Sequence, residues 1–167
     1  MTRLLIVLHL IGLAVSLGGG LCFLLVFYPA LQGLEDRSLR MRWLANAIRY
    51  YHPLFLAGIC LAFMSGAIHL TQLKIDFGAA YFAQLGKILL WKFGLTLLIF
   101  LVAGMQCFGM GMRFGRMAYG VIPGDLALQE RYAKKIWRAQ AFNLILLLAV
   151  LWLGVKLGAL IHNAPSP

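Results

Sequence analysis

Acidic residues are scarce in this chain, and its long apolar stretches contain none of them. Five Asp and Glu accompany fifteen Lys and Arg among 167 residues, which gives a formal net charge of +10. With no carboxylate inside an apolar stretch, the sequence indicates neither an acidic proton relay nor a carboxylate-based cation-transport site. A Ser/His/Asp arrangement, a phosphate-binding loop and a dinucleotide fingerprint are also missing, so hydrolysis and nucleotide chemistry are not indicated.

Cysteine is equally sparse in the sequence. Cys22, Cys60 and Cys107 are scattered, and no Cys-x-x-Cys spacing occurs. Neither a disulfide framework nor a zinc site is therefore expected. All three lie in apolar stretches, where cysteine acts as a small apolar side chain. The alternation of apolar and polar residues that marks membrane β-strands is absent as well.

Hydrophobic residues, by contrast, make up 62% of the chain. The core of a bilayer is crossed by a helix of about 20 apolar residues, and four stretches are long enough. We therefore predict an all-α integral membrane protein, a four-transmembrane-helix bundle that forms a single domain over residues 1–167. The expected helices cover residues 4–31, 50–73, 85–112 and 137–161, and the expected cytoplasmic loops cover residues 32–49 and 113–136.

Three connecting segments have features of their own. Within the first loop, residues 43–48 are expected to form a short amphipathic helix near the lipid headgroups. In the second, Asp125 is expected to cap a helix that continues into the membrane. The predicted outer loop at residues 74–84 is expected to hold an interfacial aromatic turn at Tyr81 and Phe82.

Basic residues are distributed unevenly between the two sides of the expected bundle. One side carries three, and the two predicted loops on the other side carry Arg37, Arg40, Arg42, Arg49, Arg113, Arg116, Arg131, Lys134, Lys135 and Arg138. The positive-inside rule then places these loops in the cytoplasm and both termini outside, in a plasma membrane of the bacterial inner-membrane type. Because no soluble basic domain with interleaved aromatics is present, we expect the bilayer and no nucleic acid as partner.

Two histidines inside apolar stretches share a helical face with small residues, in the sets His9, Gly12, Ser16, Gly19 and His69, Gly66, Ala62, Gly58. With both termini outside, His9 and His69 lie on the same side of the membrane, about 6–8 Å deep. Two neutral imidazoles at equal depth on neighbouring helices are suited to both axial positions of a b-type haem. The small residues are expected to leave room for the porphyrin plane.

Other side chains have two interpretations that the sequence leaves open. Lys92, about two turns inside the third helix, either extends to the headgroups or pairs with a haem propionate. His52 follows Tyr50 and Tyr51 and is expected at the membrane interface, while the role of His162 stays open. Soft sulfur ligands for copper(I) are available near the end of the third helix, although these residues are also common apolar filler; they are Met105, Cys107, Met110 and Met112.

Short motifs in three helices carry a family resemblance. The first has His9, Ser16 and a Gly-Gly pair before Phe-Tyr-Pro-Ala-Leu at 27–31; the third has Leu-Trp-Lys-Phe-Gly-Leu at 90–95; the last runs from Arg138 and Asn143 to a Val-Lys pair at 155–156. These motifs resemble those of HemJ-type protoporphyrinogen oxidases and CopD-type copper-resistance membrane proteins.

The resemblance implies a four-helix membrane protein. For HemJ-type proteins it implies haem b binding and the oxidation of protoporphyrinogen IX, with the functional histidine and lysine at His9 and Lys92. Ser16 stands where the family pattern has tryptophan, the Pro-Arg pair expected after the glycine is absent, and the histidine after the helix-three lysine is missing.

Four hypotheses follow from the sequence. The first is a membrane-embedded haem b protein that transfers electrons near the outer face, as a homo-oligomer or as a subunit beside a redox partner, with His9 and His69 as iron ligands. The second is a HemJ-like oxidoreductase in which Lys92 is catalytic. The third is a CopD-like copper transport protein, and the fourth is a structural accessory subunit without cofactor. The expected cofactor-binding set is His9, Gly12, Ser16, Gly19, Ala62, Gly66, His69 and Lys92.

Overall fold

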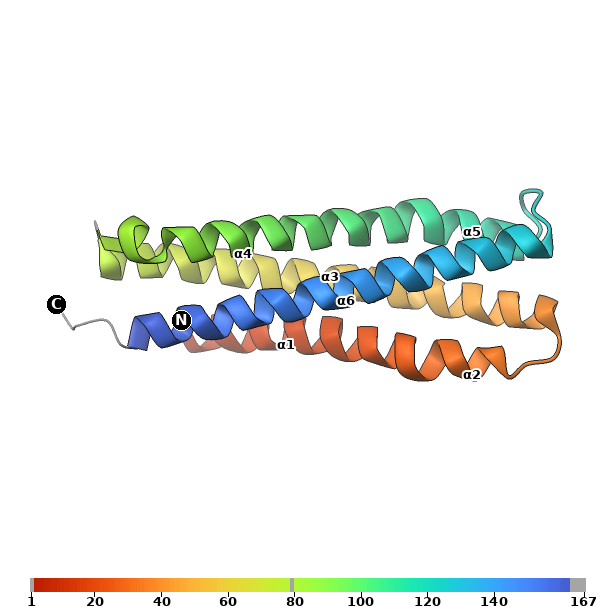
Figure 1. Ribbon diagram of the computed structural model, residues 1–167, viewed down its shortest axis with the longest axis horizontal. Helices are drawn as coiled ribbons and strands as arrows, with labels where there is room; N and C mark the ends of the chain where they lie inside the picture. The colour runs from red at the N-terminus through yellow and green to blue at the C-terminus, as the bar shows by residue number, and fades with distance from the viewer. Residues whose placement is uncertain (1, 79, 163–167) are drawn as a thin grey trace.

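The computed structural model describes residues 2–78 and 80–162, and every regular element in these ranges is helical (Figure 1). The first rod along the chain joins α1 (Thr2–Cys22), a π-helical turn η1 (Phe23–Phe27) and α2 (Tyr28–Gln32). The second rod is α3 (Arg37–Phe77), a single helix of 41 residues.

The third rod also contains a π-helical segment. It joins α4 (Ala80–Gly104), η2 (Met105–Gly111) and α5 (Met112–Ala118), and the fourth rod is α6 (Leu126–His162). Each rod contains a stretch long and apolar enough to cross a membrane, at Arg3–Gln32, Arg37–Thr71, Leu85–Ala118 and Leu126–Leu160. The prediction of an all-α, four-helix membrane bundle is confirmed, and the protein is a multi-pass membrane protein.

The helices extend further than the sequence analysis expected. Because α3 begins at Arg37, most of the predicted loop at 32–49 is the start of that long helix, not a separate amphipathic segment. One face of this extension is buried in the bundle through Met41, Leu44, Ala45 and Ile48, which explains why the helix continues. The predicted outer loop is also shorter than expected, since α4 begins at Ala80. The expected aromatic turn at Tyr81 and Phe82 is wrong, because both residues belong to this helix.

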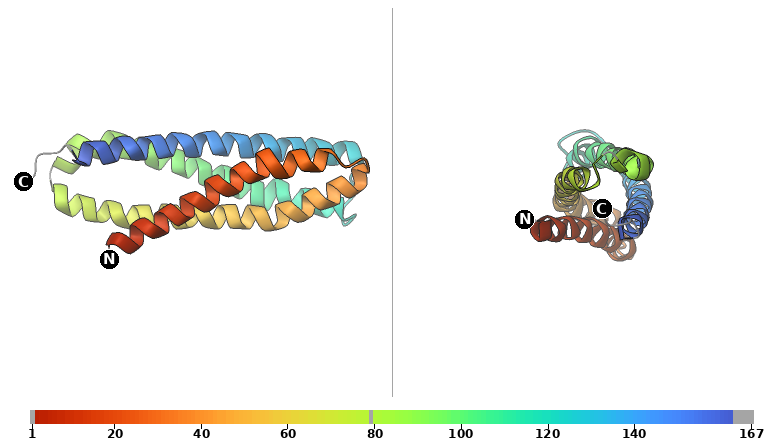
Figure 2. Two further views of the ribbon diagram at one scale, coloured as in Figure 1. Left: turned by 90° about the horizontal axis from the view of Figure 1, so that it is seen from below. Right: turned by 90° about the vertical axis from the view of Figure 1, so that its left-hand side faces the viewer.

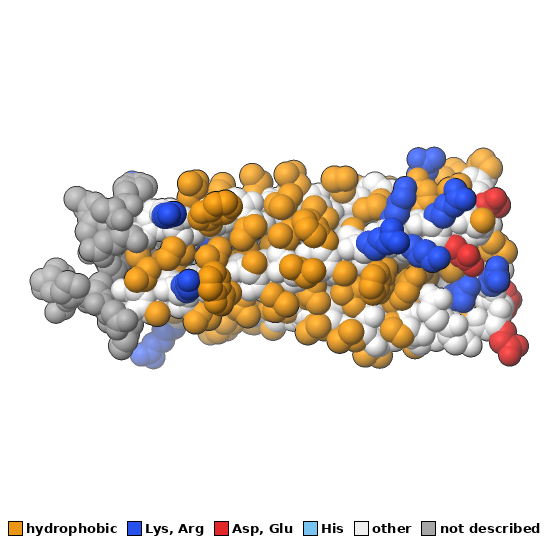
Figure 3. Space-filling model, in the orientation of Figure 1, with side chains coloured by type: hydrophobic (Ala, Val, Ile, Leu, Met, Phe, Trp, Pro, Cys, Tyr) orange, Lys and Arg blue, Asp and Glu red, His pale blue; other side chains and the backbone are white. Residues whose placement is uncertain are grey.

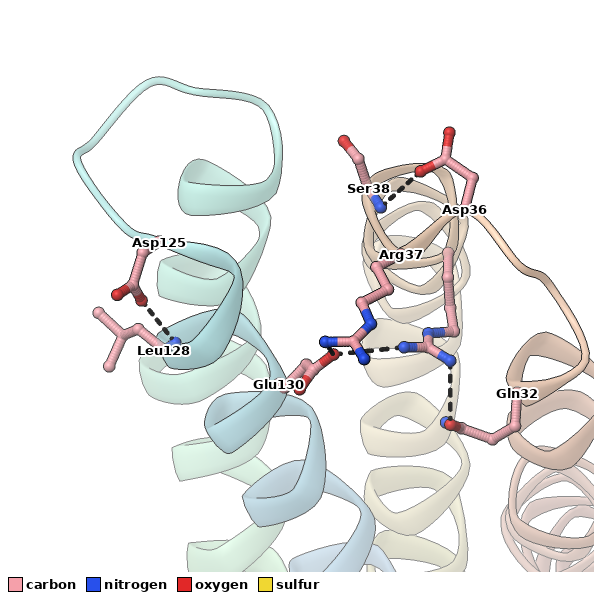
Figure 4. Close-up of polar contacts among 8 residues, drawn as sticks. Gln32, Asp36, Arg37, Ser38, Asp125, Leu128 and Glu130 are labelled. Atoms are coloured by element: carbon pink, nitrogen blue, oxygen red, sulfur yellow. Dashed lines mark hydrogen bonds and ion pairs between the residues drawn. The ribbon is translucent and has the colours of Figure 1, made fainter.

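The two long helices α3 and α6 begin at the same end of the bundle, and each begins with an aspartate cap. Asp36 accepts hydrogen bonds from the backbone N–H groups of Ser38 and Leu39, at 2.8 and 3.2 Å. Asp125 accepts one from the N–H of Leu128 at 2.7 Å (Figure 4). The predicted cap at Asp125 is confirmed, and the predicted loop at 113–136 reduces to the short connection between α5 and α6.

Charged side chains gather at this same end, which we call the basic end; the opposite end, where the two chain termini lie, is the terminal end (Figures 1 and 3). Arg40 lies 3.3 Å from the Glu130 carboxylate, and Arg37 lies 4.0 Å from it. Arg40 also donates to Gln32 at 3.5 Å, so a small polar network ties α2, α3 and α6 together there (Figure 4).

Small residues let α1 and α3 cross in direct contact. A Cβ added to Gly12 would lie 2.6 Å from the Ala62 nitrogen and 2.6 Å from the Gly58 oxygen. A Cβ on Gly58 would lie 2.6 Å from the Ser16 hydroxyl oxygen. Helices in membranes associate through such close backbone approaches. From this crossing α1 runs obliquely, and its N-terminal end is displaced outward from the other helices (Figure 2).

The interior is layered along the long axis. At the basic end a large apolar cluster includes Phe23, Leu44, Phe114 and Ile136. A second apolar cluster lies further along, around Phe55, Ile59, Ile99, Ala103, Leu146, Leu147 and Val150. Near the terminal end only a small cluster remains, formed by Leu85, Leu89 and Leu157. This sparse packing leaves space between the helices in the terminal half.

Candidate functional site

A cavity of about 400 Å³ occupies the terminal half of the bundle, between α1, α3, α4 and α6. Its volume lies in the range of small-molecule sites, about 300–1,000 Å³. Most of its wall is apolar, and Leu, Ile, Val and Phe side chains from all four helices contribute to it. The titratable side chains that line it are His9, His69 and Lys92. The structure therefore brings the three main predicted site residues to one cavity from three different helices.

His9 is held in one orientation by α3. Its Nδ1 lies 2.7 Å from the Ala62 carbonyl oxygen, which can only accept a hydrogen bond, so Nδ1 carries the proton. In the neutral ring the lone pair then lies on Nε2. The ring packs on Gly66, where an added Cβ would be 3.1 Å from His9 Cε1. An imidazole with an anchored Nδ1–H and a free Nε2 is the arrangement that metal-binding histidines adopt.

His69 lies on α3, one turn beyond Gly66. Its ring is partly buried, and Nδ1 has no hydrogen-bond partner among the described residues although it is shielded from solvent. A buried ring nitrogen without a partner is uncommon in folded proteins. His9 and His69 both line the cavity. The second histidine therefore presents unused hydrogen-bonding or ligating capacity at the same cavity as the first.

Lys92 reaches the cavity from α4. Its ammonium group lies near α6, where a Cβ added to Gly154 would be 3.4 Å from Nζ. Both ion pairs found within the described ranges involve Glu130 at the basic end, so neither includes this lysine. The side chain is partly buried and lines the cavity. A cation without an acidic partner in an apolar cavity favours a ligand that carries negative charge.

The small residues divide into two groups that the sequence analysis treated as one. Gly12 contacts the α3 backbone directly, and Gly19 faces the Tyr51 ring, with an added Cβ 3.4 Å from it. These positions are filled by protein, so they leave no room for a porphyrin plane, contrary to expectation. Ser16, which is fully buried and donates to the Gly12 carbonyl at 2.8 Å, lines the cavity together with Ala62 and Gly66.

Sequence reasoning missed three residues of the site. The Ser65 hydroxyl lies 3.4 Å from His9 Nδ1 and donates to the Leu61 carbonyl at 2.6 Å. Thr96, one turn after Lys92, donates to the Lys92 carbonyl at 2.8 Å and lines the cavity. Gly154 provides the space beside the ammonium group. Thr96 was detectable from its spacing of four residues, whereas Gly154 required knowledge of the neighbouring helix.

The remaining sequence candidates lie elsewhere. His52, expected at the interface, is only 3% exposed and lies in the interior of the basic half. Met105 and Met112 are 65% and 57% exposed, so they face outward, toward lipid, and do not converge with Met110 on an inner site. Cys107 is partly exposed. The backbone of His162 ends α6, and its side chain lies outside the described residues.

The described residues contain no group of three or more His, Cys, Asp or Glu side chains that could hold a metal ion by themselves. Comparison with protein-family models, with curated proteins and with solved structures found no match for this chain.

Proposed function

We propose that this protein binds a b-type haem in the cavity of its terminal half and takes part in electron transfer within the membrane. His9 and His69 are the proposed iron ligands, and Lys92 is the proposed partner of a propionate. The basic end would lie in the cytoplasm, as the positive-inside rule predicts, so the haem would lie toward the outer face. In this proposal the protein works with a redox partner or as a homo-oligomer in the membrane.

One observation carries the proposal: three nitrogen-bearing side chains from three helices line a cavity whose wall is otherwise mainly apolar. Ionisable groups at membrane depth are candidates for a functional role, because burying them is costly. The His9 tautomer supports the same conclusion, since its Nδ1–H is anchored on Ala62 and Nε2 is left as a ligand atom.

The chemistry of these residues fits the group. A haem with two histidine ligands uses two imidazoles within apolar walls, and a cation can pair with its propionates; His9, His69 and Lys92 supply these polar groups. A bound b-type haem would supply one-electron redox chemistry. The protein would contribute the anchored His9, the unbonded His69 nitrogen and walls that exclude water. The macrocycle would occupy the space between the four helices and not the α1–α3 contact at Gly12, which is closed.

A second candidate function is HemJ-like oxidation of a tetrapyrrole. It is favoured by the position of Lys92, whose amine lines the same cavity as His9 and has no acidic partner within the described ranges. In that case His9 would bind the cofactor and Lys92 would act on the substrate. His69 would then be dispensable for haem retention.

The test is the reduced-minus-oxidised optical spectrum of protein purified from haem-replete membranes. We expect the bands of a six-coordinate b haem at a stoichiometric level. Both His9→Ala and His69→Ala should lose them, and Lys92→Gln should retain haem with weaker binding. His52→Gln removes an imidazole outside the cavity, and Lys87→Gln removes an exposed cation on the same helix as Lys92. Both serve as matched controls that should leave the spectrum unchanged.

The other outcomes separate the alternatives. Haem that survives His69→Ala but not His9→Ala favours the second candidate. Stoichiometric copper without pigment supports a copper transport protein and overturns the haem proposal. If haem added to the folded protein gives no saturable binding and no metal copurifies, the structural-subunit hypothesis stands in its place.

A further inference from the structure

The basic half of the bundle contains a second polar region, separate from the cavity. Four fully or almost fully buried side chains meet there: His52 of α3 at 3% exposure, Gln106 of η2 at 1%, and Gln140 and Asn143 of α6 at 0%. The region lies between the apolar cluster around Phe114 and the apolar cluster that separates it from the cavity. We call these four residues, with Tyr51, the inner polar layer.

Only part of this layer is satisfied by hydrogen bonds. Asn143 donates through Nδ2 to Gln106 Oε1 at 2.8 Å, and Gln106 donates through Nε2 to the Ile136 carbonyl at 3.5 Å. Six buried atoms form no hydrogen bond of good geometry within the described ranges: both ring nitrogens of His52, both amide atoms of Gln140, Asn143 Oδ1 and the Tyr51 hydroxyl. Among them, the His52 ring lies close enough to the Gln106 carbonyl oxygen to interact with it. Buried polar atoms in native proteins are almost always hydrogen-bonded, to protein or to ordered water.

These unpartnered atoms lie close to one another around two glycines. A Cβ on Gly20 would lie 3.1 Å from Gln140 Nε2 and 3.6 Å from the Tyr51 hydroxyl. A Cβ on Gly111 would lie 2.8 Å from His52 Nδ1 and 2.7 Å from the Gln106 carbonyl oxygen. Because the two glycines have no side chain, these polar atoms pack directly against the backbone of α1 and η2.

The backbone is irregular at the same level of the bundle. Gln106 and Gly111 belong to the π-helical segment η2, and Pro53, directly after His52, lies inside α3. A proline removes one helical N–H and leaves a carbonyl oxygen without its partner, and π-helical turns often occur at functional sites. The inner polar layer therefore coincides with irregular backbone on both α3 and η2.

The donors and acceptors of the inner polar layer indicate what kind of molecule can bind there. Gln140 Nε2 is a donor, Gln140 Oε1 and Asn143 Oδ1 are acceptors, and Tyr51 and neutral His52 are both. A cation would be repelled by the donors and an anion by the acceptors, and the layer contains no carboxylate. A molecule that both donates and accepts suits the whole set, and water fills buried polar sites of this kind.

We propose that the inner polar layer is a binding site for a small cluster of ordered water molecules, enclosed between two apolar layers. These waters bridge α3, η2 and α6 and satisfy the polar atoms that the protein leaves unpaired. The site is independent of whatever the cavity binds.

Replacement of Gln140 by leucine tests the proposal through stability. If water bridges Gln140 to its neighbours, Gln140→Leu strands their polar atoms, and the thermal midpoint in detergent should fall by about 3–10 °C. If the layer is dry, the change removes two unsatisfied atoms and the midpoint should stay or rise, which overturns the proposal. Asn46→Leu, the same type of exchange at an exposed position of α3, is the control and should have little effect.

Radiolytic labelling in H₂¹⁸O tests for the water directly and does not depend on a variant that folds. Brief exposure should label His52 several-fold more than Phe114, a ring that is similarly enclosed but lies in the dry apolar cluster. Labelling no greater than that of Phe114 would contradict the proposal. Elemental analysis tests the remaining alternative, which is a metal ion bound in the layer. A stoichiometric metal that is lost in His52→Gln would show that an ion occupies the layer in place of water.

Discussion

The two halves of the bundle are built from the same helices and differ in what fills them. The basic half is closed by a large apolar cluster and by the inner polar layer. The terminal half has a small apolar cluster and a cavity of about 400 Å³. The difference arises from α1, which packs closely at its crossing with α3 and then departs from the bundle toward its N-terminal end (Figure 2).

The two halves also differ in the kind of polar side chain that they bury. In the basic half, Asn143 and Gln106 are uncharged and hydrogen-bond to each other. In the terminal half, His9, His69 and Lys92 are titratable and line open space. Two neutral amides can satisfy each other by hydrogen bonding, whereas the titratable groups of the cavity, like His52 in the inner polar layer, need a ligand or water to compensate their burial. The halves are therefore expected to respond differently to substitution.

The largest expected difference is in aromatic packing. Phe114→Ala, at a fully buried position in the basic half, should destabilise the bundle by about 3–5 kcal/mol. Phe63→Ala, on the wall of the cavity, should cost about 1 kcal/mol, because its side chain already borders open space. Equilibrium unfolding in mixed micelles measures both. Equal losses would show that the terminal half is as tightly packed as the basic half.

The helix crossing that separates the halves should be sensitive to size. Gly12→Ala places a Cβ 2.6 Å from α3 backbone atoms, so the helices must move apart at a cost of about 1–3 kcal/mol. Gly18→Ala is the matched control, since a Cβ there meets nothing within 4 Å, and its stability should be unchanged or slightly raised. Thermal midpoints of the two variants give the comparison; similar losses would contradict a specific contact at Gly12.

The hydrogen bond between Asn143 and Gln106 gives the next effect. Asn143→Leu leaves Gln106 Oε1 buried without a partner, at a cost of about 1–3 kcal/mol. The double variant Asn143→Leu with Gln106→Leu should cost less than the sum of the two single changes, because it removes both partners. Phe142→Leu, at a largely exposed neighbouring position, is the control. If the two single losses of stability add up to the loss in the double variant, the two side chains are not energetically coupled.

The smallest effect is expected at the charged surface of the basic end. Glu130→Gln removes both ion pairs with Arg37 and Arg40, and such partly exposed pairs contribute about 1 kcal/mol or less. The loss should diminish further in high salt, which screens surface charges. Glu35→Gln, at an exposed position on the same end, should have no effect. A larger loss that does not depend on salt would show that the ion pairs contribute more to the stability of this end than the packing beneath them.

Particular residues show how far sequence reasoning reached. The long apolar stretches predicted the four helices because length and hydrophobicity alone decide whether a helix can cross a bilayer. The cap at Asp125 was predicted from a local pattern and is confirmed. The start of α3 at Arg37 was missed, since the burial of Met41 and Leu44 depends on helices distant in the chain.

The candidate site likewise has residues that the sequence predicted and residues that depend on distant helices. His9, His69 and Lys92 were selected from sequence as titratable residues in apolar stretches, and they line one cavity. His52 met the same criterion but was assigned to the interface because of its tyrosine neighbours. Its place in the inner polar layer depends on Gln106 and Gln140, which come from other helices and carried no signal of their own.

The sequence by itself determined that the chain crosses the membrane in four helices, that charge gathers at one end and that titratable groups stand within apolar segments. Only the tertiary structure decided what each small residue does: Gly12 admits the backbone of α3, and Gly66 admits the imidazole of His9. The physical reason is the oblique path of α1, because spacing along a helix defines a shared face but not the distance to whatever lies opposite it.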